Sequence, residues 1–215
     1  MSSYRVSGSA RRRQNGISLI IVLLLLIASV FLGSSAAVIA LQAEKASRGD
    51  RDRQAAFQAA EAAIVDAQRD IDTAPSTGGS SRRDQAFLPG SALGFPAIDQ
   101  AERCFSKRTP RAQGLCRQAS RGTVATWLEV DIADALANAV SVPYGQFTGQ
   151  DFQTGKLTLP AKLPRYIIEL MSYNQPGAET STQQQASYFY RITAIGFGAD
   201  VNTQVVLQAF YRREN

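Results

Sequence analysis

The chain contains no histidine among its 215 residues. It therefore lacks the side chain that most often serves as an acid–base group at neutral pH and as a metal ligand. A hydrolase of the cell envelope would need paired carboxylates or a serine–lysine site instead, and no GxSxG or SxxK motif occurs. Asp131 and Asp134 lie three residues apart, but no other candidate converges on them. We expect no catalytic residue, no cofactor and no metal site, and hence no enzyme.

Cysteine is almost absent as well: Cys104 and Cys116 are the only two. A redox-active pair usually has CxxC spacing, which this chain does not have. In a domain outside the cytosol, two cysteines at this separation most simply form a structural disulfide that closes a small loop. We expect that disulfide.

Acidic residues are missing before Glu44, and proline is missing before Pro75. Ahead of both lies an apolar run from Ile17 to Leu41, about 25 residues or roughly 37 Å as a helix, which is enough to cross a bilayer. Arginines alone supply the charge ahead of it, which predicts a cytoplasmic N-terminus and a head domain across the membrane. These arginines also carry most of the net charge of +5, so the isoelectric point near 9.5 does not indicate a nucleic-acid partner.

Three hypotheses describe how the apolar run is processed. An ordinary secretory signal would be cut behind Ala36, but its apolar core would be shorter. An uncut signal anchor would leave the chain as a single-pass membrane protein. A cleavable basic leader would leave the apolar helix in the mature protein, and we favour this third reading.

A second, amphipathic stretch continues the helix from Glu44 to Asp72 without a turn signal. Its apolar residues recur at spacings of three and four, which predicts one stripe that packs against the head domain. The charged cluster from Arg48 to Arg53 indicates a solvated helix face or a contact with neighbouring subunits. The stripe consists of Phe57, Ala60, Ile64, Ala67 and Ile71.

The remaining residues predict an α+β fold in which a long N-terminal α-helix packs against an antiparallel β-sheet. Residues 123–130, 165–173, 188–197 and 203–211 alternate between apolar and polar side chains, as strands do. Residues 198–202 predict a hairpin between the last two, and residues 131–140 predict a short helix. Half-polar alternation is typical of a sheet with one packed face and one wetter face.

The basic leader, Gly16, the apolar helix and the continuous amphipathic helix together resemble a type IV prepilin. More narrowly, the block AFQAAEAA at residues 56–63 resembles the N-terminal signature of PilX-type minor pilins, and residues 190–194 and 211–213 resemble their C-terminal hairpin. The resemblance implies a leader at 1–16, a helix at 17–72 with a transmembrane part at 17–41, and a head at 73–215. It also implies cleavage after Gly16 by a prepilin peptidase and N-methylation of Ile17.

The chain departs from the major pilins at one position, because it has Ile21 where they carry a glutamate at the fifth mature residue. In pilin-like fibres this acid is thought to pair with the N-terminal amine of the previous subunit. The resemblance therefore implies a non-enzymatic minor pilin that primes pilus assembly, is tip-proximal and packs with other minor and major pilins. It would begin in the inner membrane with a periplasmic head and end in the extracellular pilus. The head could serve cell adhesion or bind a large tip adhesin. The alternative is an uncleaved membrane-anchored binding module, such as an adhesin or sensor.

Overall fold

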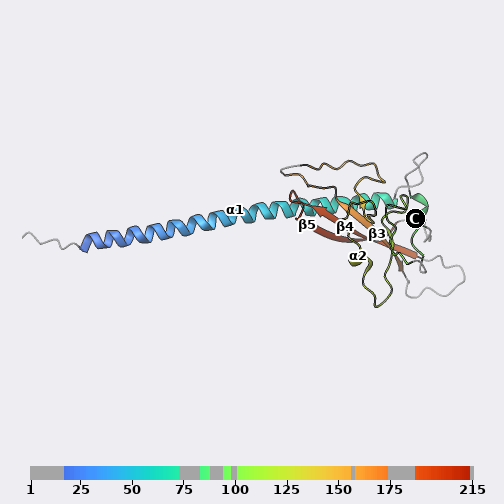
Figure 1. The fold of residues 1–215 in the computed structure, drawn as a ribbon, viewed down its shortest axis with the longest axis horizontal. Coiled ribbons are helices and arrows are strands. Elements are labelled where there is room, and N and C mark those ends of the chain that lie inside the picture. Colours follow the sequence, from blue (N-terminus) through green and yellow to red (C-terminus); the bar gives the residue numbers. More distant parts are fainter. Residues whose placement is uncertain are drawn as a thin grey trace, which may run out of the picture. The chain divides into compact units, whose positions relative to one another are not determined.

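A computed structural model describes residues 17–72, 83–87, 94–97, 101–155, 158–173 and 187–213. It contains one long helix, a sheet and short helical turns (Figure 1). In chain order the elements are α1 (Ile17–Asp72), the 3-10 helix η1 (Asp84–Phe87), β1 (Leu115–Arg117), α2 (Thr126–Glu129), β2 (Val142–Pro143), β3 (Arg165–Tyr173), β4 (Ser187–Phe197) and β5 (Gln204–Tyr211). The predicted α+β fold is confirmed.

By its contacts the chain divides into two compact units between Arg48 and Gly49, inside α1. The first unit contains the apolar part of α1. The second contains the rest of α1 and the whole sheet, so residues 49–72 belong to the head by their packing. Helix α1 runs without a break because no proline interrupts it.

The sheet is mixed rather than purely antiparallel. Its main strands follow the order β1–β3–β4–β5, and β2 also pairs with β3. Strands β3, β4 and β5 form the expected antiparallel meander, and the loop after Phe197 is the predicted hairpin. Strand β1 pairs parallel with β3, placing Leu115 opposite Ile168. The sequence prediction had no strand at β1, because three residues are too few to show an alternating pattern.

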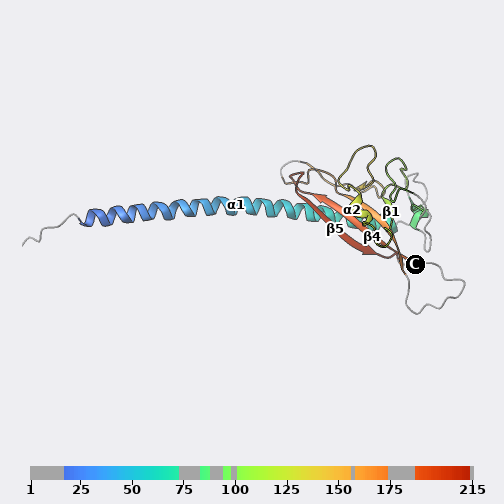
Figure 2. The same cartoon turned by 60° about the horizontal axis from the view of Figure 1, so that its bottom comes forward.

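Apolar side chains pack on both faces of the sheet. Tyr166, Ile168 and Ile192 point to the face that holds α1. Ile167, Ile195 and Phe197 point to the other face, which the disulfide segment and the region around α2 cover (Figure 2). The expected wetter face is therefore wrong for β3 and β4, whose central residues are buried on both sides.

Two predicted elements of the head are wrong. The strand expected at 123–130 is instead the helical turn α2, whose Trp127 and Val130 pack on the sheet. Side chains three residues apart share a face of a helical turn, not of a strand. The helix expected at 131–140 is a series of turns. The Asp131 and Asp134 carboxylates accept hydrogen bonds from the amides two residues on, at 2.9 and 2.8 Å, and such bonds compete with a helix.

Candidate functional site

The apolar part of α1 exposes its side chains. Its large apolar residues between Ile17 and Leu41 are 46–76% exposed, from Ile27 at the low end to Leu19 at the high end. Of the described helices, α1 alone is long and apolar enough to cross a membrane. The hydroxyl groups of its serines donate to carbonyls one turn earlier, as Ser29 does to Leu26 at 2.8 Å. Such a surface is suited to lipid or to other apolar helices.

No charge interrupts this surface. Ile21 is 52% exposed, and the first acid of the helix is Glu44, which pairs with Arg48 at 2.5 Å one turn later. Ile17, the predicted mature N-terminus, is the first residue of α1. Gly16 lies outside the described residues.

The head-facing side of α1 is wider than the predicted stripe and is shifted away from Phe57. Ala60, Ala67 and Ile71 are fully buried, and Ile64 packs partly against the core. Phe57 is 39% exposed and lies outside this buried face. The residues that sequence reasoning missed are small or acidic: Ala56, Ala59, Ala63, Asp66 and Asp70.

The small residues make room for a close backbone crossing. A Cβ atom at Gly196 in β4 would collide with the helix backbone at Ala56 and Ala60. Only glycine permits this approach, and only alanine on the helix leaves space for it. The alanines that look like simple helix formers in the AFQAAEAA block are thus the contact surface for the sheet.

Asp70 forms a buried ion pair with Arg83, which precedes η1. The Tyr166 hydroxyl donates to the same carboxylate at 3.0 Å, and burial raises the pKa of Tyr166 well above 10, so this hydroxyl keeps its proton. The Arg83 guanidinium also donates to the Gln113 carbonyl and lies 3.9 Å above the Phe147 ring. This network connects α1, β3 and the loops around them.

Two more aspartates of α1 hold loops of the head. Asp66 accepts a hydrogen bond from the Gly145 amide at 2.8 Å and another from the Thr148 hydroxyl. Burial raises the pKa of Asp66, although these hydrogen bonds oppose the shift. Asp52 accepts from the Ala199 amide at 2.5 Å, which fastens the β4–β5 hairpin to the helix. Part of the charged cluster thus contacts the chain's own head.

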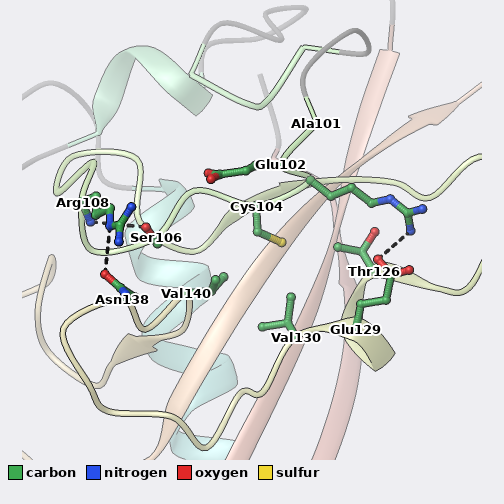
Figure 3. A pocket seen from close by; sticks show the side chains of 11 residues that line it. Ala101, Glu102, Cys104, Ser106, Arg108, Thr126, Glu129, Val130, Asn138 and Val140 are labelled. Atoms are coloured by element: carbon green, nitrogen blue, oxygen red, sulfur yellow. Dashed lines mark hydrogen bonds and ion pairs between the residues drawn. The ribbon is translucent and has the colours of Figure 1, made fainter.

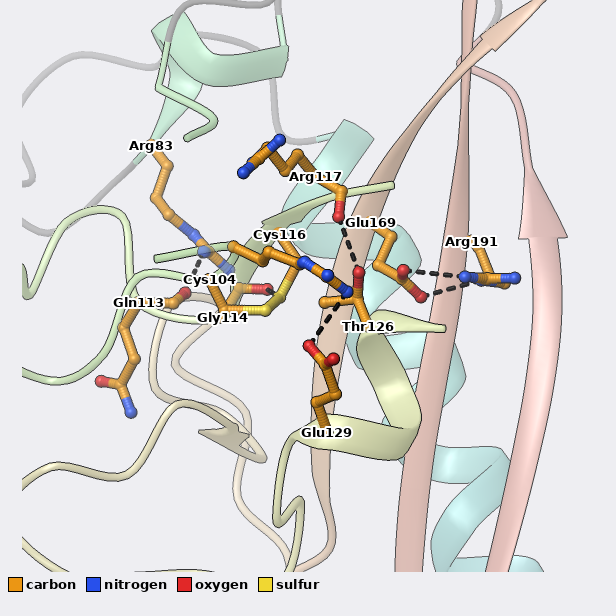
Figure 4. Close-up of a disulfide and its surroundings, with 11 residues drawn as sticks. Arg83, Cys104, Gln113, Gly114, Cys116, Arg117, Thr126, Glu129, Glu169 and Arg191 are labelled. Atoms are coloured by element: carbon orange, nitrogen blue, oxygen red, sulfur yellow. Dashed lines mark hydrogen bonds and ion pairs between the residues drawn. A yellow bond between two sulfur atoms is a disulfide. The ribbon is translucent and has the colours of Figure 1, made fainter. Parts of the chain in front are cut away.

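Cys104 forms a disulfide with Cys116, the middle residue of β1 (Figure 4). The Thr126 hydroxyl donates to the Arg117 carbonyl at 2.9 Å, linking α2 to this region. On the sheet, Arg191 donates to both carboxylate oxygens of the buried Glu169, each at 2.8 Å. This bidentate pair satisfies an acid that the packed sheet encloses.

A depression of about 530 Å³ lies between the disulfide loop and α2 (Figure 3). Its charged and polar side chains largely pair with one another: Arg103 meets Glu129 at 2.9 Å, and the Arg108 guanidinium donates to Asn138 at 2.9 Å. Among the described residues, no nucleophile lies against a base here.

An exposed apolar helix segment whose continuation packs on a sheet defines the chain as a pilin-like, membrane-anchored subunit. Comparison with known families agrees with this class. Residues 15–65 match the family model described as PilX N-terminal, and residues 112–213 match the one described as Type IV pilus assembly protein PilX C-term. Together they span more than half of the chain, which belongs to the PilX family of type IV pilus assembly proteins. No curated protein and no solved structure matches it.

Membership gives the chain its general role. It is a minor pilin, a structural component of type IV pilus assembly that interacts with other pilus components. Its apolar N-terminal helix is long and apolar enough to anchor such a subunit in a membrane.

Proposed function

We propose that this minor pilin primes pilus assembly and stays close to the pilus tip. The observation that carries the proposal is the charge-free apolar segment with Ile21 at its fifth residue. A carboxylate among apolar helices costs several kcal/mol unless a partner neutralises it. A subunit with an apolar residue there needs no amine from an earlier subunit and can be the first one.

The subunit would be made in the inner membrane with its head in the periplasm. A prepilin peptidase would cut after Gly16, and Ile17 would become the N-methylated terminus. In lipid, the exposed apolar helix stores the subunit until the helices of other minor and major pilins replace the surrounding lipid. This exchange needs no catalytic group of the chain itself, since close packing and the lipid released can drive it.

The head would then face outward with its loops held on α1 by Asp52, Asp66 and Asp70. A surface held in this way can bind a large tip adhesin or serve cell adhesion without changing shape. The disulfide between Cys104 and Cys116 would keep the loop beside β1 closed outside the cytosol.

Replacing Gly16 with leucine tests the processing step. We expect Gly16→Leu to block cleavage and to reduce the number of pili per cell, while the uncut protein stays in the membrane. Normal piliation with a functional uncut protein would show that processing is irrelevant and would contradict the proposal.

Labelling an epitope on the head tests the position in the fibre. The wild-type chain should label pilus ends, and Ile21→Glu should spread the label along the shaft because the added acid can pair with an amine. Uniform labelling of wild-type shafts would contradict a tip position.

A further inference from the structure

Strand β5 ends the sheet. It pairs with β4 on one side, and no strand of the described residues pairs with its other side (Figures 1 and 2). Natural proteins usually protect such an edge with charged residues, proline or a bulge. From Thr203 to Tyr211 there is no charge and no proline, and the register with β4 is continuous over eight pairs. The usual protection is therefore missing.

The register identifies the backbone groups that face outward. The Gly198 amide donates to the Thr203 carbonyl at 2.8 Å, so these two residues form a hydrogen-bonded pair at the start of the ladder. Because such pairs alternate along antiparallel strands, every second residue of β5 directs its N–H and C=O away from β4. These residues are Gln204, Val206, Gln208 and Phe210.

Two of these residues carry exposed apolar side chains on the sheet face away from α1. Val206 is 48% exposed and Phe210 is 66% exposed. The Phe210 ring lies 5.9 Å from that of Phe189 in β4. The edge thus combines free backbone groups with an apolar strip beside them.

On the other face, α1 supplies one exposed aromatic side chain, that of Phe57. Ala56 and Ala60 of α1 lie against Gly196 of β4, and Asp72 accepts a hydrogen bond from the Tyr211 hydroxyl at 2.5 Å, at the end of β5. Successive residues of a helix are rotated by about 100°. Phe57 therefore points between the side of α1 that faces β4, at Ala56 and Ala60, and the side that faces the end of β5, at Asp72. Its exposure of 39% follows, since no strand beyond β5 covers it.

We propose that an extended strand from another pilus component pairs with the free edge of β5. The inference rests on the proposed function at one point only, which is that the partner is another component of the pilus. The partner strand would have a central part of six to eight residues that is uncharged and apolar on both faces. One face would cover Val206 and Phe210, and the other would cover Phe57. Main-chain hydrogen bonds would supply affinity, and these side chains would supply specificity.

A second copy of this chain fits the edge poorly. The β4–β5 hairpin is held at Asp52 and the end of β5 at Asp72, so β5 runs in the same direction as this part of α1. Antiparallel pairing of two β5 strands would reverse the helix in the second copy. The chain would then enter the two heads at Gly49 from opposite ends of the pair, whereas two subunits anchored in one membrane need to enter from the same end.

Charged residues flank the strand at both ends. Asp200 precedes β5 and Arg212 follows it, and both are exposed. A partner strand with a basic residue at one end and an acidic residue at the other would complement them. Its uncharged centre would match residues 203–211.

The test uses the full chain in piliated cells, with the photoreactive residue p-benzoyl-phenylalanine in place of Phe210. We expect a cross-link to one uncharged segment of a pilus component, located by mass spectrometry. The same residue in place of Leu136, which is 75% exposed and lies outside the sheet, is the matched control and should not reach that segment.

Backbone pairing is tested at Val206. Val206→Pro removes an outward N–H without removing a hydrogen bond to β4, and proline is tolerated at such edge positions. It should reduce the Phe210 cross-link at least tenfold, whereas Val206→Thr keeps the N–H and should retain it. Val206→Lys, which leaves the backbone unchanged, provides a second variant and should also lose the cross-link because it places a charge in the apolar strip.

Three outcomes would overturn the proposal: no cross-link from position 210, a cross-link to a second copy, or equal cross-linking in Val206→Pro and Val206→Thr. The photoreactive residue in place of Leu25 separates this failure from that of the proposed function. If position 25 reaches other pilins and position 210 reaches nothing, the subunit assembles but its β5 edge stays open.

Discussion

Gly196 of β4 lies directly against the backbone of α1 at Ala56. The contact joins the strand to the helix without any side chain between them. It lies near Asp52, which holds the following hairpin through the Ala199 amide. Glycine in the strand and alanines on the helix therefore let the sheet pack directly on the backbone of α1.

Adding one carbon at this contact should be costly. Gly196→Ala would place a methyl group inside the helix backbone, and we expect a loss of about 3 kcal/mol or more in the free energy of unfolding of the head. Denaturant unfolding of the purified full chain in detergent would measure it. Gly49→Ala is the control: it lies in open space on α1 and should gain up to about 1 kcal/mol. Equal stability of the two variants would contradict the close crossing.

The sequence was informative where a pattern extends over many residues. The long helix follows from the absence of proline and from its apolar run, and β3, β4 and β5 follow from alternation over eight or more residues. Short elements did not follow. Residues 123–130 alternate as a strand does, yet a single turn at α2 brings Trp127 and Val130 onto the sheet.

The helix–sheet contact was only partly predictable for a related reason. The search for a stripe favoured large apolar residues such as Phe57, whereas a backbone crossing at Gly196 requires small ones. Asp66 and Asp70 were missed because a carboxylate on a helix usually faces water, and their partners come from loops far along the chain. The buried alanines of the AFQAAEAA block were the available signal.

The ion pair between Asp70 and Arg83 should be costly to break from one side only. Arg83→Met leaves the Asp70 carboxylate buried without its cation, and we expect a loss of about 3–5 kcal/mol in unfolding free energy. The double variant with Asp70→Leu should recover most of that loss, because no buried charge remains. If Asp70→Leu lowers the unfolding free energy as much in the Arg83→Met variant as it does in the wild-type chain, the two residues act independently and do not form a buried ion pair.

Asp66 should make the head less stable as the pH rises. Its pKa is raised in the folded chain above the ordinary value of 3.8, so the folded state binds the proton more tightly than the unfolded state does. Its contribution to stability is then greatest below about pH 4 and is lost as the pH rises through the folded pKa. Relative to Asp66→Asn, the wild-type chain should lose stability between pH 4 and 7. A wild-type advantage that grows over that range would contradict a raised pKa.

The disulfide should stabilise the head by closing the segment between cysteines twelve residues apart. Replacing both Cys104 and Cys116 with alanine should lower the unfolding free energy by about 3 kcal/mol, mainly by freeing the unfolded chain. Denaturant curves with and without a reducing agent should coincide for the variant and differ for the wild type. A wild-type unfolding curve that stays the same when the reducing agent is added would show that the disulfide adds no stability.

The most direct test of the account is the N-terminal mass of the protein recovered from sheared pili. Retention of the apolar helix after leader removal predicts a chain that begins with N-methylated Ile17. An intact Met1 would instead support an uncut membrane-anchored module, and a soluble chain that begins behind Ala36 would show that the apolar helix is discarded.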